Sequence, residues 1–161
     1  MNIGLPEKYK FVAATAGSVT TNGGVTFDTV NLENCNKAYI VAMFLQAVSH
    51  ATTIQPVVGT GVASCATSIT FSAKWWKNAD ISSTDTLVAQ TAGTSMACTA
   101  GATNQLIVIE IDPADVTGQS NTYCALGATI ATSSQASNFV TAWYLLETRY
   151  PQATPPAAIT D

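Results

Sequence analysis

The sequence is short of charged side chains. Only 10% of its 161 residues are Asp, Glu, Lys or Arg, whereas a soluble domain usually has roughly 25%. The net charge is −4 and Arg149 is the single arginine. Nucleic-acid binding is excluded as a function, because so few cations cannot neutralise a phosphate backbone. Few ions would need desolvation if this surface packed against other proteins, although an ordinary neutral surface explains the composition equally well.

Long apolar runs are also missing. No stretch approaches the roughly 20 apolar residues that a transmembrane helix needs. Met1–Lys10 contains Glu7 and lacks the apolar segment of a secretory signal peptide. We therefore expect a protein that is made and folded in a cytoplasm and that has no membrane partner.

Closely spaced metal ligands are absent. The four cysteines lie 30, 33 and 26 positions apart, at Cys35, Cys65, Cys98 and Cys124, and His50 is the only histidine. Zinc sites need clustered thiolates or imidazoles, so no metal site is predicted. A calcium site between Asp80 and Asp85 is an alternative to simple turn capping there, but the spacing does not fit an EF-hand loop. Without an export signal we expect four reduced thiols, with disulfides as the alternative.

Signatures of catalysis are absent as well. The chain has no Gly-x-Ser-x-Gly, His-Glu-x-x-His or phosphate-binding glycine loop. His50 is the only imidazole that could activate a Ser or Cys nucleophile. Asp112 and Asp115 could form an acid–base pair, but their spacing around Pro113 favours the cap of one helical turn. We expect a protein that is not an enzyme and binds no cofactor.

What the sequence does contain is a series of short apolar, β-branched segments. The clearest is Leu106–Ile111, which ends at Asp112 and Pro113. It predicts a central strand buried on both faces, followed by one helical turn over Pro113–Val116. Further strands are expected at 25–32, 38–46, 52–58, 67–71, 123–130 and 139–146, with a strand around Trp75 and Trp76 within 74–88 and a weak edge strand within 91–104. Turn signals between them predict an all-β protein, an antiparallel sandwich or barrel.

Two local features refine this prediction. Pro56 lacks an amide hydrogen and indicates an edge strand or a bulge. Trp75 and Trp76 are adjacent, so on a strand their rings point to opposite faces. We expect one ring to fill the core and the other to cover a rim or a neighbouring molecule.

The two ends of the chain predict arms around a domain at residues 19–150. Residues 1–18 have no sustained period, and Tyr9 and Phe11 could anchor them on a neighbour. Residues 151–161 are rich in proline and favour an extended, polyproline-like arm, which Tyr150 and Ile159 could hold on another subunit. A poorly ordered terminus is the alternative at both ends.

Three blocks of residues carry a resemblance to a known family. They are Trp76–Asn78 with Asp80, Ser83, Asp85, Thr86 and Leu87; Val108 with Glu110–Ala114; and Ala142, Tyr144 and Leu145 followed by Arg149, Tyr150, Gln152, Ala153, Pro155 and Pro156. From about Val25 to Asp161 the chain resembles the small capsid decoration, cement or head-stabilising proteins of tailed double-stranded DNA phages. It departs from that pattern in its Cys, Ala and Thr content and in the loop Ser133–Asn138.

The resemblance implies a jelly-roll-like β-sandwich with extended N- and C-terminal arms. Such proteins assemble as trimers on the outer capsid shell, so the implied partners are the major capsid protein and further copies of the chain, in the virion. The candidate subunit or capsid contacts are Tyr9, Phe11, Trp75, Trp76, Arg149, Tyr150, Pro155, Pro156 and Ile159. The alternatives are a head-fibre or host- and glycan-binding module of the virion, using Trp75 or Trp76, and a small hydrolase.

Overall fold

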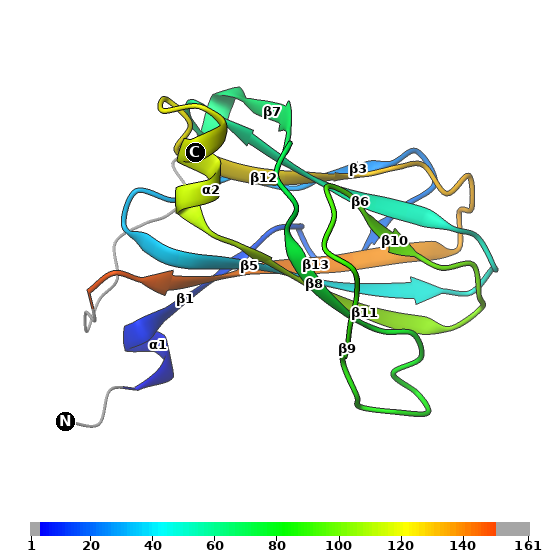
Figure 1. Ribbon diagram of the computed structural model, residues 1–161. Coiled ribbons are helices and arrows are strands. Elements are labelled where there is room, and N and C mark those ends of the chain that lie inside the picture. The colour runs from blue at the N-terminus through cyan, green and yellow to red at the C-terminus, as the bar shows by residue number, and fades with distance from the viewer. Residues whose placement is uncertain (1–3, 151–161) are drawn as a thin grey trace.

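Two antiparallel β-sheets pack face to face in the computed structural model, which describes residues 4–150 (Figure 1). Sheet A has the strand order β1-β13-β5-β11-β8-β9, with β2 also paired to β13. Sheet B has the order β10-β6-β12-β3, with β4 paired to β12 and β7 paired to β6. Sheet B is the upper layer in Figure 1 and sheet A the lower. The predicted all-β sandwich is confirmed, and its jelly-roll character stays a prediction.

The elements follow one another along the chain with these bounds. They are α1 (Leu5–Lys8), β1 (Tyr9–Ala13), β2 (Val19–Thr20), β3 (Val25–Thr26), β4 (Val30–Asn31), β5 (Cys35–Gln46), β6 (Thr52–Gly59), the 3-10 helix η1 (Val62–Ser64), β7 (Cys65–Ser68), β8 (Lys74–Asn78), β9 (Val88–Ala89), β10 (Met96–Cys98), β11 (Asn104–Ile111), α2 (Pro113–Gln119), β12 (Ala125–Ile130) and β13 (Asn138–Thr148).

The core lies between the inner faces of the two sheets. Every second residue of β5, β11 and β13 points inward, as the two-residue period of a strand requires. Sheet A contributes Ile40, Phe44, Ile107, Ile109, Ile111 and Tyr144, and sheet B contributes Ile54, Val58, Met96, Leu126 and Ile130, all of them buried. Tyr144 satisfies its hydroxyl by donating to the Asp28 carbonyl oxygen at 2.7 Å.

Strand β11 is central, as predicted, but it is not buried on both faces. It pairs with β5 on one side and with β8 on the other. Ile107, Ile109 and Ile111 are fully buried, whereas Leu106 and Val108, which point to the outside of the sandwich, are only half-buried. The prediction failed because an uninterrupted apolar run does not say which of its faces is covered by protein.

Helix α2 begins where the sequence predicts and ends later. The Asp112 side chain accepts a hydrogen bond from the Ala114 amide at 2.9 Å, which confirms Asp112 as the N-cap. The helix continues past the predicted single turn to Gln119, whose side chain accepts from the Thr70 amide at 2.9 Å and donates to the Ser68 carbonyl at 3.0 Å. These two bonds tie the end of the helix to the segment that follows β7.

Pro56 lies in an inner strand, not at an edge. Strand β6 pairs with β12 on one side and with β10 and β7, one after the other, on its second side. The Pro56 carbonyl accepts from the Ile69 amide at 3.2 Å, so its nitrogen also faces this second side. The ring therefore sits between the two short partners, where a missing amide hydrogen breaks no ladder.

Residues 25–32 form two short strands instead of one. Between β3 and β4, the Asp28 amide donates to the Ala14 carbonyl at 2.9 Å. Together with the Tyr144 hydroxyl on the Asp28 carbonyl, this bond draws the chain toward sheet A. The imperfect alternation in the sequence marks this interruption.

The first residues are not an arm over their whole predicted length. Strand β1 pairs with β13 from Tyr9 opposite Glu147 to Ala13 opposite Trp143. Val12 is buried, so the alternation of Lys8–Val12 is that of an edge strand. The partner strand lies more than a hundred residues away, which no local pattern reveals. The predicted arm at 151–161 lies outside the described residues.

Candidate functional site: the outer face of sheet A

The outer face of sheet A carries a continuous row of apolar side chains. Residues directly opposed in antiparallel strands place their side chains on the same face. The pairing of β1, β13, β5, β11, β8 and β9 aligns Ala13, Trp143, Val41, Val108, Trp76 and Ala89 in that order. Solvent-facing positions of a sandwich are normally polar, so a whole row without a polar side chain needs an explanation.

Neighbouring rows extend this surface along the strands. Phe11, Leu145 and Tyr39 lie in one row, which ends in Glu110 and Lys74. Met43 and Leu106 belong to a second row, between Thr141 and Asn78, and Phe139 and Leu45 belong to a third. The apolar face, as the term is used from here on, consists of Phe11, Tyr39, Val41, Met43, Leu45, Trp76, Leu106, Val108, Phe139, Trp143 and Leu145. Phe11 is 57% exposed, Trp143 38% and Phe139 37%, and the others are half-buried.

The apolar face is large for a monomer. An aromatic side chain covers roughly 150–250 Å², so the exposed parts of these side chains add up to on the order of 500 Å². The largest apolar patch on a typical monomer is roughly 300–600 Å² and is often functional. The face therefore lies at the upper end of what a monomer exposes, on a chain of only 16.7 kDa.

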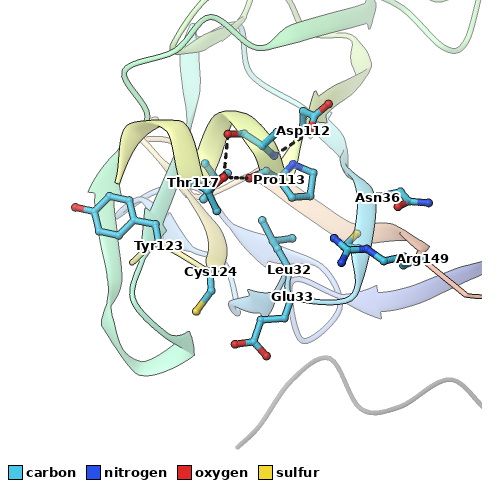
Figure 2. A pocket seen from close by; sticks show the side chains of 12 residues that line it. Leu32, Glu33, Asn36, Asp112, Pro113, Thr117, Tyr123, Cys124 and Arg149 are labelled. Atoms are coloured by element: carbon cyan, nitrogen blue, oxygen red, sulfur yellow. Dashed lines mark hydrogen bonds between the residues drawn. The ribbon is translucent and has the colours of Figure 1, made fainter. Parts of the chain in front are cut away.

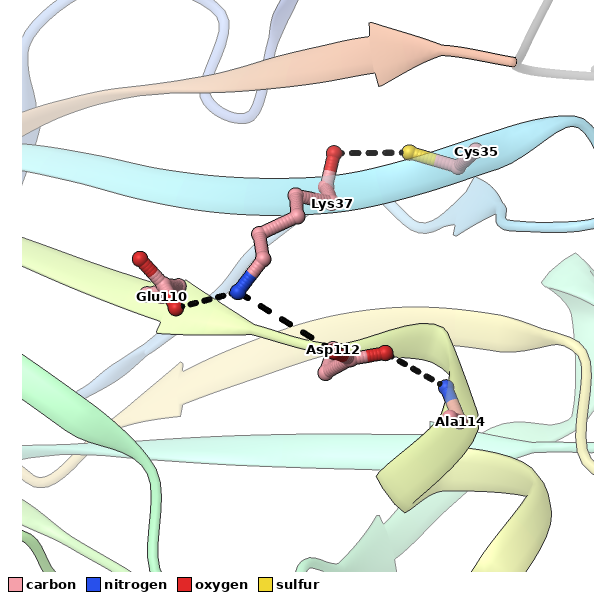
Figure 3. A network of polar contacts seen from close by, with 5 residues as sticks. All are labelled: Cys35, Lys37, Glu110, Asp112 and Ala114. Carbon is pink, nitrogen blue, oxygen red and sulfur yellow. Dashed lines mark hydrogen bonds and ion pairs between the residues drawn. The ribbon is translucent and has the colours of Figure 1, made fainter.

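Charged residues border the apolar face on one side, at its rim. Lys37 on β5 reaches across to Glu110 on β11, with 2.6 Å between Nζ and Oε1, and lies 4.0 Å from an Asp112 carboxylate oxygen (Figure 3). The hydrogen bond to Glu110 raises the pKa of Lys37. Lys8 pairs with Glu147 at 3.2 Å, which raises the pKa of Lys8.

The opposite border is formed by the segment between β8 and β9. The Asn78 side chain donates to the Thr84 carbonyl at 2.6 Å, and the Ile81 amide donates to the Asn104 carbonyl at 2.9 Å. Asp80 shapes this turn by accepting from the Ser82 amide at 3.0 Å and from the Ser83 hydroxyl, which confirms its predicted capping role. The hydrogen bond from Ser83 lowers the pKa of Asp80.

The outer face of sheet B is different. Its pairs place Thr26 beside Thr129, Thr129 beside Gln55, and Thr53 beside Ala97. The Gln55 amide donates to the Thr94 carbonyl at 2.8 Å. These outward positions carry hydroxyl, amide and small side chains, as expected of a sheet face that meets water.

The predicted contact residues lie in different parts of the structure. Phe11 and Trp76 lie on the apolar face, and Tyr9 is half-buried on the same side of β1 at the rim. Trp75 points into the core, where its Nε1 donates to the Thr91 carbonyl at 2.9 Å. The prediction that the two tryptophans face opposite ways is confirmed.

The remaining candidates lie at the end of the sandwich or beyond the described chain. The Arg149 amide donates to the Asn34 carbonyl at 2.9 Å, and Tyr150 is 67% exposed. Pro155, Pro156 and Ile159 lie outside the described residues.

A pocket of about 450 Å³ opens beside Arg149 (Figure 2). It is lined by Leu32, Glu33, Cys35, Asn36, Asp112, Pro113, Ala114, Val116, Thr117, Tyr123, Cys124 and Arg149. Three of its polar groups have intramolecular partners: Asp112 caps α2, the Thr117 hydroxyl donates to the Ala114 carbonyl at 3.0 Å, and the Cys124 thiol donates to the Thr60 carbonyl at 3.2 Å. The arrangement favours a structural role for these side chains.

Histidine and cysteine side chains do not converge on a reactive centre. Within residues 4–150, no three His, Cys, Asp or Glu side chains gather as metal ligands would. In this same range His50 Nδ1 is buried without a hydrogen-bond partner. Burial raises the pKa of the Cys35, Cys65 and Cys98 thiols to about 12, which keeps them protonated and unreactive at neutral pH. None of the helices described over 4–150 is long and apolar enough to span a membrane.

Sequence reasoning missed most of the apolar face. Of its residues, the sequence predicts only Phe11 and Trp76 as contacts: Phe11 is an aromatic residue near the terminus, and Trp76 belongs to an adjacent pair of tryptophans. The missed signal was the alternation inside Ala38–Gln46: Tyr39, Val41 and Met43 interleave with the core residues Ile40 and Ala42. In an antiparallel sandwich, a strand with no polar positions has an apolar outer face.

Comparisons with known proteins find only weak structural similarity. No protein-family model and no curated protein matches the sequence. The crystal structure of SPBc2 prophage-derived protein YomS gives a TM-score of 0.47 at 9% identity, covering 86% of this chain and 91% of that one.

Two structures of infectious bursal disease virus, one of its Gt strain and one of a T13 particle, each give a TM-score of 0.28 at 10% and 8% identity. Each match covers 92% of this chain but only 46% and 43% of the viral chains. Scores and identities this low transfer neither a partner nor a function.

Proposed function

We propose that this protein is a structural component of a phage head, a decoration or cement protein. In this proposal it binds the outer surface of the icosahedral capsid as a homotrimer, contacts the major capsid protein and stabilises the shell. The observation that carries the proposal is the apolar face of sheet A, a surface suited to permanent contact with protein. That the contact is made on a phage head is supported by the resemblance of three sequence blocks to phage decoration proteins.

The chemistry of the rest of the described surface supports a packing role over a catalytic one. Asp112, Thr117 and Cys124, which line the pocket beside Arg149, already form hydrogen bonds within the fold. Charged residues are scarce, so docking desolvates few ions. A trimer also suits the threefold positions of a capsid, because three linked weak contacts raise the effective affinity without any new contact.

A head-fibre or glycan-binding module of the virion is the second candidate. Phe11, Trp76 and Trp143 place aromatic rings on one outer face, and carbohydrate binding uses exposed aromatic rings. The two functions differ in their partner: the first needs the capsid and the second needs a sugar.

Sedimentation with capsids that lack the protein distinguishes the two candidates. Light scattering on the purified chain is expected to give about three times 16.7 kDa, and added protein is expected to sediment with the capsids and to restore their resistance to heat or to a chelator. An unrelated acidic β-sandwich of similar size serves as the control for non-specific pelleting. A protein that binds a glycan array saturably and never sediments with capsids contradicts the decoration role and supports the second candidate.

A further inference from the structure

We infer that the apolar face of sheet A is the interface between copies of this chain, so that one copy covers the face of another. This inference rests on the proposed function, in which the face is a protein-docking surface, and it names the partner. The capsid contact then lies on some other surface of the assembled oligomer.

The size of the face is the first argument. A standard interface buries roughly 800 Å² on each partner, of which somewhat more than half is apolar. The apolar face offers on the order of 500 Å² of that kind of surface from its exposed side chains alone. One face therefore supplies the apolar area that a stable contact between two copies needs.

The composition of the face is the second argument. Interfaces between identical subunits are more apolar than those between separately soluble partners, and their centres are poor in charge and rich in aromatic residues and methionine. The central row, with Trp143, Val41, Val108 and Trp76, has no charged side chain, and Met43 lies in the adjoining row. A capsid-docking surface has to stay soluble until the capsid is met, whereas another copy is present as soon as the chain is made.

The charges at the rim are the third argument. Lys8, Lys37 and Lys74 stand there with Glu110, Asp112 and Glu147, so the formal charges cancel. The chain as a whole carries −4, and the balanced rim holds none of this excess, while Asp80 and Asp85 lie at the opposite border. At this rim, another copy can therefore cover the apolar face without like-charge repulsion.

The test compares three single substitutions to glutamate. Trp143→Glu places a carboxylate in the central row. Phe11→Glu and Val88→Glu are a matched pair, because Phe11 is 57% exposed and Val88 56%, yet only Phe11 belongs to the face. Val88 lies opposite Lys77, which aligns with the inward-pointing Ile107 and so faces the other side of the sheet. Far-UV circular dichroism and thermal unfolding report whether each variant folds.

Light scattering and sedimentation velocity at matched concentrations give the readout. The wild-type chain is expected to be an oligomer, and Trp143→Glu a folded monomer whose association is weakened at least about 100-fold, as at an interface hot spot. Phe11→Glu is expected to weaken association more than Val88→Glu, which is expected to behave like the wild type. If Trp143→Glu does not fold, the association of Phe11→Glu compared with that of Val88→Glu tests whether the apolar face is the interface.

Some outcomes separate the inference from the capsid binding of the proposed function. A wild-type monomer at high micromolar concentration that sediments with capsids overturns the inference and the proposed trimer, and leaves capsid binding standing. An oligomer that survives both Trp143→Glu and Phe11→Glu shows that copies meet elsewhere. Conversely, an oligomer that Trp143→Glu dissociates but that never sediments with capsids upholds the inference and contradicts the decoration role.

Discussion

The two outer faces of the sandwich are built on the same scaffold and have opposite chemistry. Sheet A presents Trp143, Val41 and Val108 to the outside, whereas sheet B presents Thr53, Gln55 and Thr129. Both inner faces contribute apolar side chains to one core. The core does not use the apolar outer face of sheet A, which is the surface that the proposed assembly would cover.

The largest expected effect on association comes from making the outer face of sheet A as polar as that of sheet B. Replacing Val41 and Val108 by Thr and Met43 by Gln removes apolar contact while keeping β-forming side chains at the two valine positions. We expect a folded monomer in which association is lost, measured by sedimentation velocity. The control adds Val to sheet B at positions 53 and 129, and should leave the oligomer unchanged. An intact oligomer in the first variant would mean that the polarity of this face is irrelevant to assembly.

Neighbouring residues of β11 separate folding from assembly. Ile107 points into the core and is fully buried, whereas Val108 points to the outside. Ile107→Ala is expected to lower the free energy of unfolding by about 2–5 kcal/mol, because it deletes buried methyl groups and leaves a cavity. Val108→Ala should cost less than about 1 kcal/mol.

Urea denaturation in the Trp143→Glu background measures both free energies without a contribution from association. Equal losses of stability from Ile107→Ala and Val108→Ala would show that some part of the chain covers the outer face.

The same two residues show what sequence can and cannot predict. Leu106–Ile111 and the Asp112 cap were predictable, because β-branching, a proline and an N-cap residue act locally. Ile107 and Val108 look alike in sequence, and only the pairing of β11 with β5 and β8 decides which one faces the core. The pairing of β1 with β13 likewise depends on contacts between the two ends of the chain. Single residues of the apolar face could therefore be predicted from the sequence, but their assembly into one face could not.

A smaller effect is expected at the charged rim, beside the apolar face. Asp112→Ala removes the N-cap of α2 and should cost about 1 kcal/mol of unfolding free energy. Asp112→Asn keeps the cap and removes the charge near Lys37, so it should cost less. Both variants should remain oligomeric by light scattering. Loss of the oligomer in Asp112→Asn would assign an assembly role to the charged rim.

The smallest effect concerns the thiols that the two sheets bury between them. Cys35 lies on sheet A and Cys98 on sheet B, and burial raises the pKa of each to about 12. A raised thiol pKa means that the folded state holds its proton longer than the unfolded state, whose thiols titrate near 8.5. Stability from this source is full below pH 8.5 and is lost as the pH rises toward 12.

Native alkylation at pH 8 should be slow at both cysteines and fast after denaturation. Rapid native labelling of Cys98 alone would show that sheet B is loosely packed.

The central claim is that the apolar face of sheet A is covered by another copy of the chain. Hydroxyl-radical footprinting of the wild-type protein and of Trp143→Glu measures this directly, because Trp, Met and Phe side chains react readily when exposed. We predict that Met43, Trp76 and Phe11 are protected in the wild type and become reactive in the variant, while Leu87 and Val88 react equally in both. Equal reactivity of Met43, Trp76 and Phe11 in the two proteins would contradict the account.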